Sequence, residues 1–274
     1  MSPLTGDKKQ HGKALKGVLD RIRDSGLKLY EKKCRTGVTE TTFLGHMITA
    51  EGIKPDPKKI EAITDTPTPS NKTEVQHFLG MITYLDKFLP HLSDETAPLR
   101  QLLEKDVEWH FEEHHHHAVQ WLKNLVTSTP ILTYYDPNLP LRITADPFKS
   151  GLEAVLEQGH QDTWKPVAFA SRAMTQSEQN YAQIEKEILA IVFACECFHE
   201  YSYGRAVTVR SDHKPLKAIF TKPLSKAPPR LQRLLLRIQR YDLHVQYTPG
   251  TDIPVADALS RAYLTKVIKL HQLS

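Results

Sequence analysis

The spacing of hydrophobic and polar positions changes partway along the chain. In residues 70–90, SNKTEVQHFLGMITYLDKFLP, apolar residues recur three and four positions apart behind a Ser/Asn cap, which predicts an amphipathic helix. The segment AVQWLKNLV at 118–126 repeats this spacing, whereas TTFLGHMITAEGI at 41–53 is typical of a hairpin. We therefore expect the first 130 residues to be mainly helical.

From residue 141 onward, apolar positions alternate with a period of two, which predicts strands. The alternating segments are LRITAD (141–146), PVAFAS (166–171), AVTVRSD (206–212) and YDLHVQY (241–247). A long helical pattern, from about Ser177 to Tyr201, lies among them. The second half is therefore α/β. The proline-rich segment 127–140, TSTPILTYYDPNLP, predicts the boundary between the halves.

Two of the predicted strands end on an aspartate. In 141–146 the apolar positions are odd-numbered, so Asp146 lies on the opposite face at the end of its strand. Asp212 has the same relation to residues 207–211. If the strands are neighbours about 4.7–4.9 Å apart, both carboxylates can reach one divalent cation. Proline follows Asp146 and stops the strand where the carboxylate is presented.

Three further acids are candidates for the same site. Glu185 and Glu187 lie at opposite margins of the buried face of the long helix, and periodicity does not choose between them. Asp257 begins a short predicted helix after Pro254, as a cap-region residue or a ligand. Oxygen ligands favour Mg²⁺ or Mn²⁺, and two such ions roughly 3.5–4 Å apart clamp the oxygens of a phosphoryl displacement. Taken alone, these acids also fit surface or capping roles.

Five segments in the second half resemble one known domain. They are ITADPFKSGLEAVLEQ, NYAQIEKEILAIVFACE, VRSDHKPL, RLQRLLLRIQRYDLHVQYTPG and VADALSR. In this order they resemble the ribonuclease H domain of a gypsy-type LTR retrotransposon reverse transcriptase. Upstream, FLGHMITAEGIKPDPKKIEAI and VQHFLGMITYLDKFLP resemble the end of the polymerase palm and the thumb and connection. The resemblance implies three parts: a palm remnant with a primer-grip-like hairpin (1–50), a helical thumb/connection-like domain (51–130) and a ribonuclease H-like domain (138–264).

The resemblance also implies a fold and an activity. The fold is α/β, a ribonuclease H-like mixed five-stranded sheet flanked by helices, and the activity is two-metal cleavage of the RNA strand of an RNA–DNA hybrid. The family's acids fall on Asp146, Glu187, Asp212 and Asp257. Glu187 is preferred to Glu185 because the family's glutamate stands just before Ile-Leu-Ala. Asp146 would bridge two Mg²⁺ or Mn²⁺ ions, with Glu187 and Asp212 completing one and Asp257 the other.

Basic residues suggest where nucleic acid binds. The net charge of +4 and the pI near 8.8 permit a polyanionic partner without requiring one. In residues 228–242, arginines follow one another three, four and three positions apart beside an apolar stripe, at Arg230, Arg233, Arg237 and Arg240. With the resemblance, this stripe is expected to track phosphates; the alternative is a solvated helix face. Lys214 is either a phosphate contact or a surface lysine.

The chain also departs from the family pattern. Pro147 follows the first aspartate, and Glu153 stands where glycine is usual; we expect Glu153 to point to solvent. No Tyr-x-Asp-Asp motif occurs in the chain, so DNA polymerisation is not expected from it alone. These departures favour an alternative, a catalytically inactive nucleic-acid-binding remnant. A transposase or integrase of the same broad fold is disfavoured, because its motifs are not found.

The chain shows no sign of a membrane or secreted protein. It has no apolar leader after Met1 and no apolar run near 18 residues, and its three cysteines cannot all pair with one another. We therefore expect an intracellular protein, cytoplasmic or nuclear.

Overall fold

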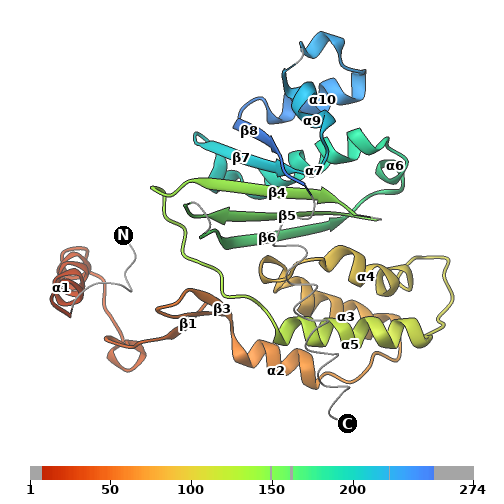
Figure 1. Ribbon diagram of the computed structural model, residues 1–274. Coiled ribbons are helices and arrows are strands. Elements are labelled where there is room, and N and C mark those ends of the chain that lie inside the picture. The colour runs from red at the N-terminus through yellow and green to blue at the C-terminus, as the bar shows by residue number, and fades with distance from the viewer. Residues whose placement is uncertain (1–7, 149, 161–162, 222, 250–274) are drawn as a thin grey trace, which may run out of the picture.

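The structure, a computed structural model, describes residues 8–148, 150–160, 163–221 and 223–249. A mainly helical N-terminal half lies beside a β-sheet, and further helices cover the other side of that sheet (Figure 1). The helices of the first half are α1 (Lys8–Asp24), η1 (Glu31–Lys33), α2 (Pro57–Asp65), α3 (Lys72–Thr83), η2 (Asp86–Phe88), α4 (Leu92–Gln101) and α5 (Glu113–Thr127). Among the described residues, no helix is long and apolar enough to cross a membrane.

The hairpin predicted in residues 41–53 is present and is extended by a third strand. Strands β1 (Thr41–Phe43), β2 (His46–Ile48) and β3 (Ile53–Pro55) form a small antiparallel sheet. Gly45 has a φ of 73°, a left-handed conformation that suits glycine at the β1–β2 turn. A backbone bridge joins Ile53 to Leu132, so this sheet is tied to the segment that leads into the second half.

The helices α2 to α5 pack around one apolar core. The side chains of Asp56 and Asn71 cap α2 and α3 by accepting a backbone N–H from the first turn of each helix. The apolar positions expected to be buried in residues 70–90 are all buried: Val75, Phe78, Leu79, Ile82, Leu85 and Phe88. Two residues of the large sheet, Val155 and Phe169, belong to the same core. The helical half is therefore packed onto the sheet.

The second half contains the mixed five-stranded sheet expected from the resemblance. Its strands are β4 (Leu141–Pro147), β5 (Gly151–Gln158), β6 (Lys165–Ala173), β7 (Ala206–Ser211) and β8 (Asp242–Tyr247), in the order β6-β5-β4-β7-β8. Strand β4 is antiparallel to β5 and parallel to β7. Strands β5 and β6 are antiparallel, and β7 and β8 are parallel.

Helices cover both faces of this sheet. On one face, α7 (Gln183–Cys197) packs against β4 and β5, and α9 (Pro215–Thr221) and α10 (Pro229–Ile238) pack against α7. On the other face, η2 contacts β6, and α4 contacts both β5 and β6. A Cβ at Gly151 would collide with Ser93 Oγ, so this glycine permits the close approach of α4 to β5. Strand β5 is buried almost throughout as a result.

The long helix expected from Ser177 to Tyr201 is broken into three. They are α6 (Gln176–Gln179), α7 and α8 (His199–Ser202). The side chain of Thr175 caps α6 by accepting from Glu178 N, and Ala182 is extended before α7 begins. Residues 180–182 therefore separate α6 from α7. Glu185 and Glu187 lie in the first two turns of α7. The remaining short helix is η3 (Leu224–Lys226).

Candidate active site

Three carboxylates meet where strands β4 and β7 end. The two strands are parallel neighbours, with Thr144 opposite Arg210, so Asp146 and Asp212 come from adjacent strand ends. Glu187 reaches the same point from the second turn of α7. The three side chains each offer a carboxylate oxygen, and these oxygens all lie within 4.8 Å of one another. The neighbouring strands that the sequence analysis required are confirmed.

The surroundings of Asp146 disfavour its ionised form. Its side chain reaches solvent, yet desolvation by the crowded protein atoms raises its pKa from 3.8 to about 7, and the negative charges of Glu187, Asp212 and Glu153 add to the effect. His91 acts in the opposite direction. Burial likewise raises the pKa of Glu187, which is 4% exposed. A bound cation would relieve the repulsion among these groups.

The structure separates the two glutamates of α7. Glu187 is directed to the carboxylate cluster, and Gln183 Nε2 donates to its Oε1 at 2.8 Å. Glu185 instead accepts the backbone N–H of Ala182 at 3.1 Å and forms an ion pair with Arg230 at 2.9 Å. Glu185 therefore helps begin α7 and attaches α10 to it, and Glu187 is the glutamate that joins the cluster.

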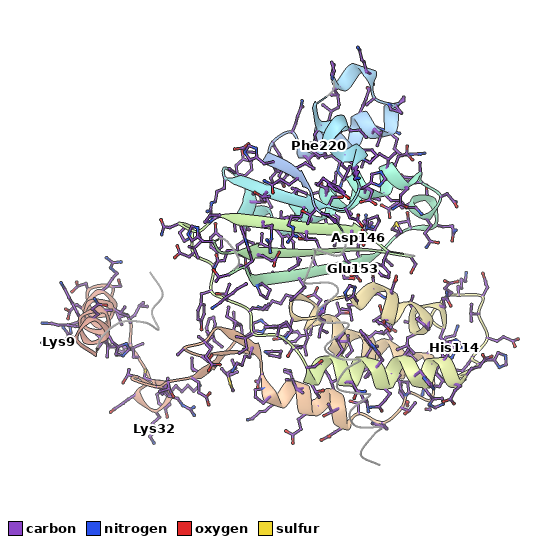
Figure 2. All side chains as sticks on the ribbon, viewed as in Figure 1. Lys9, Lys32, His114, Asp146, Glu153 and Phe220 are labelled. Atoms are coloured by element: carbon purple, nitrogen blue, oxygen red, sulfur yellow. The ribbon has the colours of Figure 1, made fainter. Side chains whose placement is uncertain are left out.

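The expectation that Glu153 points to solvent is wrong. Glu153 is the cross-strand neighbour of Asp146 in the β4–β5 pair, and its side chain is 12% exposed. Its Oε2 lies 2.5 Å from Nδ1 of His91, which immediately precedes α4. In Figure 2, Asp146 and Glu153 lie at the same end of adjacent strands. The packing of α4 on this face leaves Glu153 little access to solvent and directs it to His91.

His91 is a site residue that the sequence analysis missed. It lies in the turn between η2 and α4, far from Asp146 along the chain, with a left-handed φ of 56°. A lone histidine in a turn follows no motif and no periodic pattern. Only the packing of the helical half onto the sheet brings it to Glu153.

The roles of two further predicted site residues are not tested by the structure. Asp257 is outside the described residues, so its role as a fourth metal ligand stays a prediction. Lys214 is exposed two positions after Asp212, with its Nζ 5.1 Å from the centroid of the Tyr247 ring. Its role as a phosphate contact also stays a prediction.

The four arginines predicted to contact phosphates, three in α10 and Arg240 just after it, have different surroundings. Arg237 donates to both carboxylate oxygens of Glu196, at 2.7 and 3.0 Å, and Arg230 pairs with Glu185. Arg240 lies over the ring of Tyr241, 5.1 Å from its centroid. Arg233 is exposed and, within the described part of the chain, has no ion pair. Two of the four predicted phosphate contacts therefore already hold α10 against α7.

The cluster suits hard divalent cations. Asp146, Glu187 and Asp212 supply oxygen ligands from three separate elements and include no histidine or cysteine, which favours magnesium or manganese over zinc. The raised pKa of Asp146 reflects its desolvation and, after that, the carboxylates that the fold holds beside it. The residues present therefore fit a divalent metal ion.

Comparison with known proteins identifies relatives of the chain. Residues 136–241 match the family model of the RNase H-like domain found in reverse transcriptase. The retrovirus-related Pol polyprotein from transposon 297 of Drosophila melanogaster is 36% identical over 254 residues, which are 92% of this chain and 23% of the relative. The transposon Tf2-3 polyprotein of Schizosaccharomyces pombe is 31% identical over 92% of this chain and 19% of the relative. The chain spans about a fifth of the length of these relatives.

Solved structures share the fold. A foamy viral protease-reverse transcriptase dRH in complex with double-stranded DNA aligns with a TM-score of 0.76 and 22% identity, over 89% of this chain and 44% of that chain. A foamy viral protease-reverse transcriptase in complex with an RNA/DNA hybrid aligns with a TM-score of 0.75 and 21% identity, over 92% of this chain and 34% of that chain. At these identities the similarity shows the fold.

Proposed function

Because residues 136–241 form the ribonuclease H-like domain of reverse transcriptases within a chain homologous to retrotransposon Pol polyproteins, we propose that this protein hydrolyses the RNA strand of RNA–DNA hybrids. The convergence of Asp146, Glu187 and Asp212 carries this proposal. One structure with the same fold is a complex with an RNA/DNA hybrid, which supports a hybrid as the substrate. We assign no DNA polymerisation to this chain, since it contains no Tyr-x-Asp-Asp motif.

The proposed mechanism gives each site residue a task. Asp146, Glu187 and Asp212 would hold the divalent ions, with Asp257 as the proposed fourth ligand. Such ions, when bound, activate the attacking water and stabilise the leaving oxygen of an in-line displacement. Gln183 keeps the Glu187 carboxylate directed at the cluster through its hydrogen bond. The fixed strand ends of β4 and β7 hold the aspartates in place before substrate arrives.

Positively charged side chains would hold the hybrid beside the cluster. Lys214 and Arg233 are exposed cations on the ribonuclease H-like half, and contacts of this kind neutralise phosphates and release counterions. The 2′-hydroxyl of the RNA strand is the group by which such a site distinguishes RNA from DNA. Hybrid binding is therefore expected to weaken steeply as salt concentration rises.

The test is cleavage of a hybrid with a labelled RNA strand by purified protein in Mg²⁺ or Mn²⁺, beside Asp146→Asn and Asp212→Asn. We expect cleavage of the RNA strand by the wild type, none by either variant, and no cleavage of the same sequence as double-stranded DNA. Cleavage that persists in both variants would point to a contaminating nuclease and would contradict the proposal.

A second candidate is an inactive protein that binds nucleic acid without cutting it. The observation that favours it is Glu153, an additional acid packed beside Asp146. The family usually has glycine at this position. Folded wild-type protein that binds the hybrid and leaves it intact with either ion would establish this second candidate.

A further inference from the structure

We propose that His91 is a positioning residue for the carboxylate cluster: by binding Glu153 it keeps this fourth carboxylate away from Asp146 and the metal ions. The proposal rests on the proposed nuclease function, because it concerns the same cluster. His91 belongs to the helical half and is not one of the proposed metal ligands.

The contact between His91 and Glu153 is short and protected. Nδ1 of His91 lies 2.5 Å from Oε2 of Glu153, and the two side chains are 22% and 12% exposed. An Nδ1–H donates to an ionised carboxylate whether or not the other ring nitrogen is protonated. The contact therefore holds in either charge state of the imidazole.

Glu153 has little else to hold it. Its second oxygen, Oε1, is buried and, among the described residues, has no hydrogen-bond partner. Buried carboxylates without partners are costly, so a released Glu153 would turn to the strongest available cation. Cross-strand neighbours have Cβ atoms roughly 4.5–5.5 Å apart, which puts the Asp146 site within its reach.

There is also room for such a movement. A cavity of about 50 Å³ lies between the turn before α4 and the sheet, and His91, Asp146 and Glu153 all line it. Thr144 lines it too, and its buried Oγ1 has no hydrogen-bond partner within the described part of the chain. The region around Glu153 is therefore incompletely filled, and it contains an unpaired hydroxyl besides the carboxylates.

Several acidic side chains lie around His91. Glu95 of α4 is half-buried, and burial followed by the charge of Asp94 raises its pKa, while Glu153 adds to that effect. His91 acts in the opposite direction on both Glu95 and Asp146. The imidazole is thus a basic group among several acids where the helical half meets the sheet.

The experiment is a double-mutant cycle of His91→Asn and Glu153→Gln. Asparagine tolerates the left-handed φ of residue 91, and its side chain is too short to keep the contact. Three quantities are measured on four proteins: kcat and KM for hybrid cleavage, and the affinity for Mn²⁺ by electron paramagnetic resonance.

We expect His91→Asn to lower kcat about tenfold and to tighten Mn²⁺ binding about threefold, with KM changed by less than about twofold. In the Glu153→Gln background, the same substitution should change kcat and Mn²⁺ affinity by less than about twofold, because no free carboxylate remains. Equal effects of His91→Asn in both backgrounds would overturn the proposal.

Ser171→Ala is the matched control. Ser171 Oγ accepts the backbone N–H of Ser93 at 2.8 Å, in the same contact between α4 and the sheet; Ser171 lies opposite Glu153 in the β5–β6 pair, and the Glu153 carboxylate pairs with His91 instead. A loss of kcat in Ser171→Ala equal to that of His91→Asn would show general loosening of this contact and would also overturn the proposal. If wild-type protein cleaves no hybrid, the nuclease function fails, while the Mn²⁺ affinities still decide on His91.

Discussion

Strand β4 carries a charged cross-strand pair near each end, and the two pairs are of opposite kind. At its start, Arg142 lies opposite Glu157 and donates to both carboxylate oxygens at 2.9 Å. At its end, Asp146 lies opposite Glu153, a residue of the same charge. The first pair satisfies its own charges, whereas the second concentrates negative charge next to Glu187 and Asp212.

The two pairs have different roles: the first stabilises the core, and the second belongs to the candidate active site. Arg142 is 8% exposed and also lies 4.1 Å from the centroid of the Trp164 ring, so this pair is a complete element of the core. The pair at the end of β4 is incomplete, because like charges that are held together need an outside cation or a basic neighbour. Divalent ions and His91 meet that need in our proposals.

The largest expected effect distinguishes the two glutamates of α7, one in the carboxylate cluster and one in an ion pair. Glu187→Gln should lower hybrid cleavage on the order of 10³-fold, because a metal ligand contributes several kcal/mol of transition-state stabilisation. Glu185→Gln, two positions away and paired with Arg230, should change cleavage by less than about threefold per folded molecule. Single-turnover rates at saturating Mg²⁺ measure both. Equal losses would mean that the cluster is assigned to the wrong glutamate.

The next prediction concerns the ion pair of Arg142 and Glu157. Arg142→Met should lower the free energy of unfolding by about 3 kcal/mol or more, because it leaves Glu157, which is 1% exposed, without its partner. Urea unfolding measures this loss. The double variant with Glu157→Met should recover most of it, since an apolar pair of similar volume has no buried charge to satisfy. No recovery would show that packing, and not charge, governs this end of the strand.

A smaller effect concerns the like-charged pair in the absence of metal. The folded-state pKa of Asp146, about 7, is above its ordinary value of 3.8, so between these pH values the folded protein binds more protons than the unfolded chain. Stability contributed by this group is therefore present at low pH and lost as pH rises towards 7. Asp146→Asn should stabilise the metal-free protein at pH 8 by about 1 kcal/mol, reduced by solvent screening at this exposed side chain.

Thermal or urea unfolding in a chelator at several pH values measures that difference. The two proteins should converge near pH 4, where Asp146 is protonated in the folded state. A variant that is less stable than the wild type at pH 8 would contradict the desolvation and repulsion that raise the pKa of Asp146.

The smallest effect compares paired and unpaired arginines on α10. Arg233→Ala should reduce the slope of log affinity against log salt by about 1, as expected for a lost phosphate contact. Arg237→Ala should change this slope less, because its guanidinium already binds Glu196. Fluorescence anisotropy of a labelled hybrid at several salt concentrations measures both slopes. A larger change in Arg237→Ala would show that the pair with Glu196 opens when the hybrid binds.

Much of the fold follows from local patterns. Strands with one solvent-facing or polar side, such as β4 and β7, alternate visibly, and this parity correctly indicated that Asp146 and Asp212 lie at corresponding strand ends. Strand β5 was not indicated by alternation, because helices cover both of its faces and seven of its eight residues are buried. The resemblance to a known family, and not the periodicity, supplied the fifth strand.

The sequence by itself determined which residues carry charge and in what order the elements follow. It indicated that two aspartates end two strands and that a helix between them bears two glutamates. Periodicity did not choose between these glutamates, and the family motif favoured Glu187, which lies in the cluster. Only the tertiary structure decided that Glu185 pairs with Arg230 and that Glu153 faces His91 in place of solvent. The reason is physical: periodicity reports which face of its own element a residue occupies, whereas charge partners are set by packing between elements distant along the chain.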